Sequence, residues 1–372
     1  MSGISKIKVC FVCPKVYPLF DAGCAGVIGG AEVDLYNLGT ELAKDPSFEV
    51  SYVTADYGQE AEVQIEGVRL IRSLNFKRGL ISGATRLWGA MRRADADVYM
   101  IKTASPGVPL TAAFCRLHGR RFVYRSAHQD DCDGTYLRRH PIIGKAYVRA
   151  LKRASLITTQ NESDRNNLSR LHGLESVVIP NGHRLASVIA GARETILWVG
   201  RTAQFKHPER FIALARRLPS EKFVMICQQA TGDESYEGVV RRAAETANLT
   251  FSSRVAYHAI DAYFQAARVL VNTSDAEGFP NTFIEACKWG VPILSLNVNP
   301  DDFLDHWSCG VCCNGDEEGL VKGLQWLLDK DRYIEVGGNA RRYVEATHDI
   351  TTIVELYKEF FRQLAAREQL RR

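Results

Sequence analysis

The sequence lacks a long hydrophobic run. No segment reaches roughly eighteen consecutive apolar residues, the length that a membrane-spanning helix requires. Residues 1–8 lead directly into a predicted strand and contain no apolar signal-peptide core. We therefore expect a cytoplasmic protein that is neither secreted nor embedded in a membrane.

Acidic residues are missing from two stretches in the first half of the chain. Residues 67–94 contain seven Lys or Arg residues and residues 134–161 contain six, although the formal net charge of the whole chain is only +4. In the first stretch the basic residues are interspersed with Leu80, Ile81, Leu87, Trp88 and Met91. This composition suits a helix that lies on an anionic membrane surface. A helix that faces a protein core and has a solvated basic side is the alternative.

Cysteine is not scarce, but its pattern does not indicate a disulfide framework or a metal site. The ten cysteines include two C-x-x-C pairs, Cys10/Cys13 and Cys309/Cys312. The first pair lies in a predicted strand, where residues three apart point to opposite faces and cannot converge on one ion. We interpret the cysteines as reduced and structural, with zinc binding as a weaker alternative.

Short apolar runs and helical patterns alternate along the first half of the chain. Predicted strands occupy 7–13, 48–54, 98–101, 122–127, 156–159 and 176–179, with one or two short strands within 61–71. Predicted helices occupy 31–44, 80–93, 106–118, 142–153 and 162–171. This alternation predicts a parallel, doubly wound sheet.

A second alternating series follows a break at 180–182 and a predicted connector, 185–193. Its predicted strands occupy 195–199, 223–227, 250–256, 269–272 and 291–296. Its predicted helices occupy 208–218, 234–247, 262–267, 281–289, 317–328 and 333–347, and an amphipathic helix, 351–368, ends the chain. A chain of 372 residues is long enough for two domains, so the sequence predicts two similar α/β domains.

The stretch 268–296 combines a strand, a loop, a helix and a second strand. Pro280 lies where the helix can begin, because the missing N–H of proline is not needed there, and Gly290 can end the helix. Glu277 lies in the loop and Glu285 lies inside the helix, with seven residues between them.

The start of this predicted helix has the properties of an anion site. The first-turn amides of Asn281 and Thr282, together with the helix dipole, favour a negatively charged ligand. Two carboxylates beside such a site suit a ligand that carries phosphate in the middle and hydroxyl groups at both ends. A nucleotide sugar is a ligand of this kind.

The segment from Glu277 to Ala286 resembles the E-x7-E signature of retaining GT-B glycosyltransferases of family 4. The resemblance implies that Glu277 contacts the hydroxyls of the donor sugar and that Glu285 holds the ribose. It also implies that Gly278, Phe279, Asn281 and Thr282 belong to the donor site. The family often has Gly at the position of Pro280, so one backbone donor to the phosphate is absent in this sequence.

The resemblance also implies an architecture and covers nearly the whole chain. The GT-B fold consists of two Rossmann-like, doubly wound domains that face one cleft. We therefore expect an acceptor domain at 1–185 and a nucleotide-sugar donor domain at 194–348. The last helix, within 349–372, is expected to pack back on the first domain.

Two cations follow the first strand of the second domain. Arg201 comes directly after Trp198-Val199-Gly200, and Lys206 comes five residues later. Open α/β sheets bind ligands at the ends of their strands, and two cations can neutralise a leaving diphosphate without a metal. The pattern resembles the G-R-x-x-x-x-K diphosphate clamp of the family. Two solvated surface cations are the alternative.

Gly29 and Gly30 open the first long helix, where small residues let the backbone approach a phosphate. The rival interpretation is a dinucleotide-binding fingerprint with Asp56 as the ribose ligand. The spacing is wrong for it, because that fingerprint directly follows a strand and these glycines lie far downstream of Cys13. A plain flexible loop remains the alternative to a phosphate-approach loop.

His128 follows the strand predicted at 122–127 and precedes a polar loop. The family often has a histidine there that contacts the donor sugar, whereas a lone histidine is commonly structural. Two D-x-D triplets, 95–97 and 131–133, are of the kind that holds manganese in the other large transferase fold. The first lies at a helix–strand turn on the wrong edge of the sheet, and neither outweighs a metal-independent reaction.

These features predict a glycosyltransferase that needs no cofactor or metal. It would move a sugar from a nucleotide-diphosphate sugar, most simply a UDP-sugar, to a saccharide or lipid-linked acceptor with retention, in polysaccharide or glycoconjugate biosynthesis. His128, Glu277, Arg201 and Lys206 are the expected catalytic residues. Location on the inner face of the membrane is a hypothesis, and no nucleic-acid partner is expected. A sugar-nucleotide epimerase or hydrolase, and a non-catalytic nucleotide-sugar binder, are the rival functions.

Overall fold

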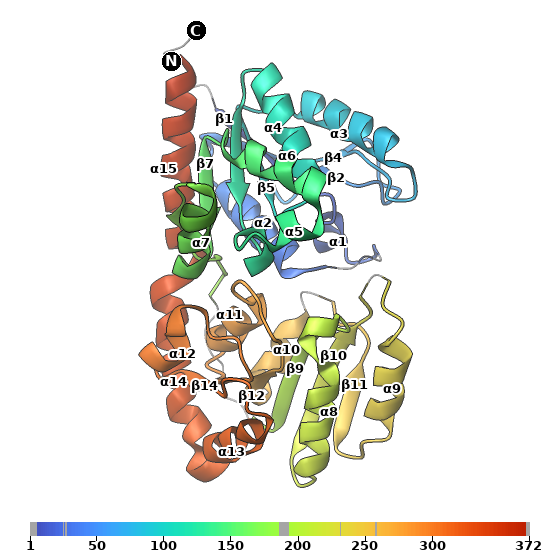
Figure 1. Cartoon of the computed structure of the whole chain (residues 1–372), viewed down its shortest axis with the longest axis vertical. Coiled ribbons are helices and arrows are strands. Elements are labelled where there is room, and N and C mark those ends of the chain that lie inside the picture. The colour runs from blue at the N-terminus through green and yellow to red at the C-terminus, as the bar shows by residue number, and fades with distance from the viewer. Residues whose placement is uncertain are drawn as a thin grey trace. The chain divides into compact units, whose positions relative to one another are not determined.

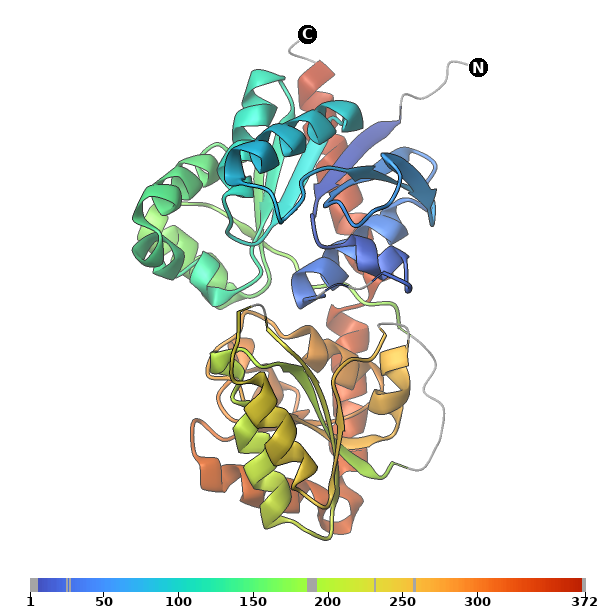
Figure 2. The same ribbon diagram turned by 90° about the vertical axis from the view of Figure 1, so that its right-hand side faces the viewer.

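The computed structural model describes residues 6–24, 26, 28–185, 193–230, 232–256 and 259–369. The chain divides into two compact units, residues 1–184 with 350–372, and residues 185–349. Each unit is a sheet with helices packed on it, as Figures 1 and 2 show. Most of the predicted connector, 186–192, lies outside the described residues.

The first unit is built on an eight-stranded sheet with the order β3-β4-β2-β1-β5-β6-β7-β8. Every neighbouring pair is parallel except β3–β4. The strands are β1 (Ile7–Val12), β2 (Phe48–Thr54), β3 (Glu62–Ile65), β4 (Val68–Arg72), β5 (Val98–Lys102), β6 (Arg121–Arg125), β7 (Leu156–Thr159) and β8 (Val177–Val178). The chain builds outward from β1 to β4 and then returns to β5 on the other side of β1, so the sheet is doubly wound, as predicted.

Helices cover both faces of this sheet. They are α1 (Tyr17–Phe20), α2 (Gly30–Leu42), α3 (Leu80–Ala94), α4 (Gly107–Leu117), α5 (Thr135–Arg139), α6 (Pro141–Leu151), α7 (Glu162–His172) and α15 (Ile350–Gln369). The C-terminal helix α15 contacts α2, β1 and β5, so the last helix of the chain completes the first unit. Strand β5 is buried at every position, which is expected of a parallel strand covered on both faces.

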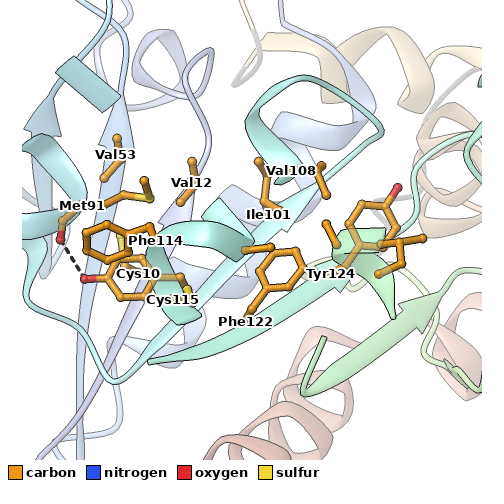
Figure 3. Close-up of a cluster of buried hydrophobic side chains, with 14 of the residues drawn as sticks. Cys10, Val12, Val53, Met91, Ile101, Val108, Phe114, Cys115, Phe122 and Tyr124 are labelled. Atoms are coloured by element: carbon orange, nitrogen blue, oxygen red, sulfur yellow. Dashed lines mark hydrogen bonds between the residues drawn. The ribbon is translucent and has the colours of Figure 1, made fainter. Parts of the chain in front are cut away.

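Alternate residues of β1 point to different helical layers. Cys10 and Val12 join the cluster drawn in Figure 3, together with Met91 of α3 and Phe114 of α4. In the same cluster Tyr99 Oη donates a hydrogen bond to the Met91 carbonyl (2.7 Å). Burial of these side chains, each contributing about 1.5–3 kcal/mol relative to an exposed side chain, holds α3 and α4 against the sheet.

The second unit is built on a six-stranded, fully parallel sheet with the order β11-β10-β9-β12-β13-β14. Its strands are β9 (Thr195–Arg201), β10 (Lys222–Gln228), β11 (Leu249–Ser252), β12 (Ala267–Asn272), β13 (Ile293–Ser295) and β14 (Gly310–Cys312). Its α-helices are α8 (Pro208–Arg217), α9 (Tyr236–Ala244), α10 (Ile260–Gln265), α11 (Asn281–Lys288), α12 (Phe303–His306), α13 (Glu317–Leu328) and α14 (Arg332–Thr347), and the short 3-10 helix η2 spans Gln204–Lys206. This order places β9 beside β12, which positions the loops that follow both strands.

Two glycines let α14 approach the end of α11. Gly290 has φ of +63° and ends the helix in the left-handed conformation, as the sequence predicts. A Cβ atom on Gly337 would lie 2.1 Å from the Gly290 carbonyl oxygen, so α14 can lie this close only with glycine there. Helix α14 therefore packs against the end of α11, the helix that carries Glu285.

Candidate functional site

Lys206 and Glu277 meet in the second unit. Lys206 ends η2, which follows β9, and Glu277 lies five residues beyond the end of β12. The Lys206 Nζ atom is 3.0 Å from both carboxylate oxygens of Glu277, and their side chains are 14% and 13% exposed. The pair therefore remains partly accessible at the edge where the parallel strands end.

Two further side chains hold the Glu277 carboxylate. Asn272 Nδ2 donates to Oε1 at 3.1 Å and Ser274 Oγ donates to the same oxygen at 2.7 Å. Burial alone would raise the pKa of Glu277, but the Lys206 charge and these hydrogen bonds outweigh it and lower that pKa. Glu277 is therefore an anion at neutral pH and acts as a hydrogen-bond acceptor.

Hydrogen bonds also join the loop after β9 to the loop after β12. Thr273 Oγ1 donates to the Lys206 carbonyl at 2.6 Å and accepts from Trp198 Nε1 at 3.0 Å. The Asp275 amide donates to the Phe205 carbonyl at 2.8 Å. These bonds fix the position of the Lys206 backbone relative to the loop that carries Glu277.

Arg201 is the last residue of β9, so the strand extends two residues beyond the prediction. Its side chain is partly exposed, and its guanidinium makes no hydrogen bond or ion pair within the described part of the chain. Arg201 and Lys206 thus differ: Lys206 already has an anionic partner, and Arg201 has no such partner among the described residues.

His207 was not predicted from the sequence, yet it joins the same region. Its Nε2 atom is 2.7 Å from Asp275 Oδ2 and its Nδ1 atom is 2.8 Å from Glu209 Oε1. Burial lowers the pKa of His207, but the two carboxylate hydrogen bonds outweigh burial and raise it. His207 therefore links the start of α8 to the loop that carries Glu277. No motif signalled it, because both partners depend on the fold.

Helix α11 starts where the sequence predicts. Pro280 is the capping residue and the Phe283 amide donates to its carbonyl at 3.0 Å. Asn281 and Thr282 are partly exposed in the first turn, whereas Glu285 is buried one turn later. Lys288 Nζ lies 3.3 Å from Glu285 Oε2.

The side chain of Phe279 belongs to the core. It packs against Phe303, Tyr343 and His348, with ring centroids 4.9–6.4 Å apart. The ring is thus engaged in the core, and the assignment of Phe279 to the donor site stays a prediction. The neighbouring Gly278 is also buried.

In the first unit, Gly29 and Gly30 lie at the start of α2, as predicted. The Gly29 amide donates to Glu32 Oε2 at 2.8 Å, and a Cβ atom on Gly29 would lie 2.8 Å from that oxygen. The Glu32 carboxylate thus already accepts a hydrogen bond from one amide at the start of the helix. A phosphate that approached Gly29 would have to displace it.

His128 lies at the start of a 3-10 helix, η1 (Gln129–Asp131), three residues beyond the end of β6. Its Nδ1 atom accepts a hydrogen bond from the Asp130 amide at 3.1 Å, and its side chain is partly exposed. The carboxylate of buried Asp131 accepts from the amides of Ala104, Ala127 and His128 at 2.8–3.2 Å. Burial raises the pKa of Asp131 and outweighs the three amide hydrogen bonds, which lower that pKa.

Both D-x-D triplets are engaged in the structure. Asp131 binds three amides, and Asp133 Oδ1 accepts from the Thr135 amide at 2.8 Å. Asp97 accepts from the Lys8 amide and Asp95 pairs with Arg120, at the opposite edge, where β1 and β6 begin. Among the described residues no group of three His, Cys, Asp or Glu side chains comes together as metal ligands do.

A buried ionic cluster in the first unit was not predicted. Asp34 of α2 accepts from Lys102 Nζ at 2.6 Å and from Arg125 Nε at 2.7 Å. Arg125 also donates to Asn181 Oδ1 at 2.6 Å and to Tyr357 Oη of α15 at 2.7 Å. The Asp34, Lys102 and Arg125 side chains are only 1–3% exposed.

The ionisation of this cluster follows from its geometry. Burial alone would raise the pKa of Asp34, but the charges of Arg125 and Lys102 outweigh it and lower that pKa to about 2. Burial lowers the pKa of Lys102 to about 8, although Asp34 opposes the shift. The cluster thus holds two cations against one carboxylate.

The cysteines are free, and those in the first C-x-x-C pair are buried. Burial raises the pKa of the Cys10 thiol to about 12. No described helix has both the length and the hydropathy that crossing a membrane requires.

Two family models match the chain. The one described as "Glycosyltransferase Family 4" matches residues 28–186, and the one described as "Glycosyl transferases group 1" matches residues 183–346. Together they span both units.

Curated relatives are also glycosyltransferases. A 2-deoxystreptamine N-acetyl-D-glucosaminyltransferase of Niallia circulans is 25% identical over 196 residues, which are 51% of this chain and 49% of that protein. The match thus spans about half the length of that relative. An uncharacterized glycosyltransferase of Haemophilus influenzae is 22% identical over 353 residues, 90% of this chain and 96% of that protein.

Solved structures share the fold. The sucrose-phosphate synthase of Thermosynechococcus elongatus has a TM-score of 0.80 at 17% identity, with 97% of this chain and 100% of that chain covered. An Escherichia coli protein described as trehalose-6-phosphate bound with UDP-2-fluoro glucose has a TM-score of 0.70 at 13% identity, with 96% and 99% covered.

The two parallel-sheet units and the likeness to these solved structures show the GT-B fold. The two family models show that the chain is a glycosyltransferase. More narrowly, the two family models together account for residues 28–346, and the chain belongs to the family 4 glycosyltransferases.

Proposed function

We propose that this glycosyltransferase moves a sugar from a UDP-sugar to a saccharide acceptor with retention of configuration. The observation that carries the proposal is the contact between Lys206 and Glu277, which brings a cation and a carboxylate together where two neighbouring parallel strands end. The first turn of α11, which begins four residues after Glu277, would add backbone donors.

The predicted polar site residues of the second unit each have a role in this scheme. Lys206 and Arg201 bind the diphosphate, and the amides at Asn281 and Thr282 add neutral donors. Glu285 holds the ribose. Glu277 accepts hydrogen bonds from the sugar hydroxyls: its Oε1 already accepts from Asn272 and Ser274, so Oε2 has more capacity for a ligand. In the first unit, His128 is the proposed contact to the sugar.

The reaction breaks the bond between the anomeric carbon and the diphosphate oxygen. The acceptor hydroxyl oxygen forms the new bond on the same face of the sugar, and the departing phosphate takes the acceptor proton. Charge develops on the diphosphate, so cations held before the reaction stabilise the transition state more than the ground state. No cofactor takes part in this scheme.

Metal independence is part of the proposal. Its support is that both D-x-D triplets already bind protein groups, Asp131 through three backbone amides. We expect activity to persist in EDTA. Loss of activity that manganese restores would contradict this part of the proposal.

We also propose that the acceptor is lipid-linked, in polysaccharide or glycoconjugate biosynthesis, and that the enzyme acts on the cytoplasmic face of a membrane. The burial of α3 agrees with the alternative of a core-facing helix: Leu87 and Met91 are buried, and Trp88 packs against Phe114. The basic face of α3 is therefore the solvated side of a core-facing helix.

The support lies instead in two exposed segments, residues 76–81 and 138–143. Every residue in both segments is exposed, and Leu80, Ile81 and Ile142 are 84–87% exposed. The first segment ends in the first turn of α3, which follows β4, and the second segment joins α5 to α6 after β6. Lys77, Arg78, Arg138 and Arg139 lie in the same segments. Aliphatic tips beside cations suit the interface of an anionic bilayer.

Thermal-shift measurements and an assay of sugar transfer and UDP release test the proposed function. We expect UDP and one UDP-sugar to raise the melting temperature by mass action, because a ligand at one hundred times its Kd raises the free energy of unfolding by about 2.7 kcal/mol. Proton NMR should show the transferred or released sugar with the anomeric configuration of the donor. Inversion would contradict retention. UDP release that never depends on a saccharide acceptor would favour a hydrolase or epimerase, and binding without turnover would favour a non-catalytic binder.

A further inference from the structure

Lys288 is a buried cation beside the proposed ribose ligand. It is the last residue of α11 and lies one turn after Glu285, with its Nζ atom 3.3 Å from Glu285 Oε2. Lys and Glu are rarely buried unless they are paired, and here both side chains are buried. The E-x7-E signature does not include this lysine.

Asp261 holds Lys288 from a different helix. Lys288 Nζ lies 2.9 Å from Asp261 Oδ1 and 3.2 Å from Oδ2, and Asp261 is in the first turn of α10. Trp289 Nε1 donates to the same Oδ1 atom at 2.9 Å, and the Trp289 ring lies 5.3 Å from Nζ. The ammonium is therefore fixed between two carboxylates and an aromatic face.

The simplest structural role for Lys288 would be a favourable charge at a helix C-terminus. That role gives about 0.3–1 kcal/mol for an exposed side chain, and it needs neither burial nor a partner on α10. Burying an ammonium costs several kcal/mol before its partners compensate. The burial of Lys288 between two carboxylates is easier to explain if its ammonium positions the Glu285 carboxylate.

We propose that Lys288 is a positioning residue that holds the Glu285 carboxylate in its orientation toward the ribose hydroxyls, with Asp261 anchoring Lys288. This inference rests on the proposed function, which assigns Glu285 to the ribose. A carboxylate can accept hydrogen bonds from two vicinal hydroxyls when both of its oxygens are oriented toward them. Recognition of the ribose diol would then depend on Lys288 without any direct contact.

The test compares UDP with 2′,3′-dideoxy-UDP, which lacks the ribose diol. We expect the parent protein to prefer UDP by at least about tenfold in Kd, the scale of one charge-assisted hydrogen bond. Lys288→Met should reduce this preference to less than about threefold by weakening UDP more than the dideoxy analogue. Lys288→Arg should restore most of the preference. A purely structural role would weaken both ligands equally.

A double-mutant cycle and two further variants complete the design. In a Glu285→Gln background, Lys288→Met should add little to the loss of UDP preference, because Lys288 acts through Glu285. Asp261→Asn keeps an acceptor for Trp289 and should give an intermediate loss, which serves if Lys288→Met folds poorly. Lys222→Met, which removes an exposed lysine paired with Glu194, should leave the preference unchanged.

The outcomes separate the two proposals. A parent protein that does not bind UDP would overturn the proposed UDP-sugar function and this inference with it. A parent protein that prefers UDP, with the same preference in Lys288→Met and Asp261→Asn, would overturn this inference alone. Additive losses in the double-mutant cycle would also overturn it.

Discussion

In both units, charged side chains lie where two neighbouring parallel strands end. The charged side chains of the first unit are buried, and those of the second unit are partly exposed. In the first unit Lys102 ends β5 and Arg125 ends β6, and both bind Asp34 with side chains only 1–3% exposed. In the second unit Lys206 follows β9 and binds Glu277, with 14% and 13% exposed. The same position at a parallel sheet edge thus carries a sealed cluster in one unit and an accessible pair in the other.

The difference lies in what occupies the remaining hydrogen-bonding capacity. Arg125 donates to the Ile179 carbonyl, to Asn181 and to Tyr357 of the C-terminal helix, so protein groups surround its guanidinium. Arg201 has no comparable partner within the described residues. A charged group that the protein satisfies completely stabilises the fold, whereas one with spare capacity can bind a ligand.

Arg125→Met should have the largest effect of the changes considered. It leaves the buried Asp34 carboxylate with one cation instead of two and removes the link to α15, so we expect a loss of about 3–5 kcal/mol in the free energy of unfolding. Urea unfolding of the whole chain measures it. Tyr357→Phe, which removes a single hydroxyl, is the matched control and should cost about 1 kcal/mol. Stability within 1 kcal/mol of the parent in Arg125→Met would contradict the structural role of the cluster.

Lys206→Ala should show the opposite pattern, with a large effect on activity and a small one on stability. Removing one donor that stabilises the departing diphosphate should reduce kcat/KM by about two orders of magnitude or more. Steady-state kinetics with the preferred UDP-sugar measures it, and urea unfolding provides the control. Activity within a few-fold of the parent would remove Lys206 from the diphosphate site.

The acid stability of the first unit should depend on Asp34. Its pKa is about 2 in the folded chain, below its ordinary value, because Arg125 and Lys102 outweigh burial. The stabilisation, about 2 kcal/mol, should therefore be complete above pH 4 and be lost as the pH falls toward 2. Unfolding monitored at several pH values measures it. Asp34→Asn should lose this pH dependence, and an unchanged acid limb in that variant would show that other carboxyls control it.

Replacing Glu285 and replacing Glu277 should have different effects on ligand binding. Glu285→Ala should weaken the binding of bare UDP, because a ribose ligand acts on UDP and UDP-sugar alike. Glu277→Ala should leave UDP binding largely intact and reduce turnover and sugar selectivity. Calorimetric titration of both variants with UDP measures the difference. Equal loss of UDP binding in both would show that the roles are wrongly divided.

Much of the fold was predictable from the sequence because it rests on local patterns. The strand and helix alternation, the helix stop at Gly290 and the doubly wound class follow from periodicity and turn residues. The short elements α5, α12 and β14 were missed, because three to five residues show no period. Phe279 was assigned to the donor site by its place in a motif, while its ring packs in the core with Phe303 and Tyr343.

The candidate site was predictable as residues but not as contacts. Glu277 and Lys206 stand out in their motifs, yet their contact joins residues 71 apart and depends on β9 lying beside β12. The bond between Arg125 and Tyr357 joins residues 232 apart and has no sequence signal at all. Lys288 has no sequence signal, because its contact with Asp261 joins two different helices.

The smallest expected effect concerns the exposed segments 76–81 and 138–143. If their aliphatic tips and cations contact a bilayer, the protein should co-sediment with anionic liposomes at low salt and less so at high salt. Each basic residue near the surface contributes about 1 kcal/mol, so attachment should be reversible. The double variant Ile81→Ser and Ile142→Ser should reduce binding at both salt concentrations, since it removes only apolar contact. Ile334→Ser, an exposed isoleucine of the second unit, is the matched control. Absence of binding at low salt would favour a soluble acceptor.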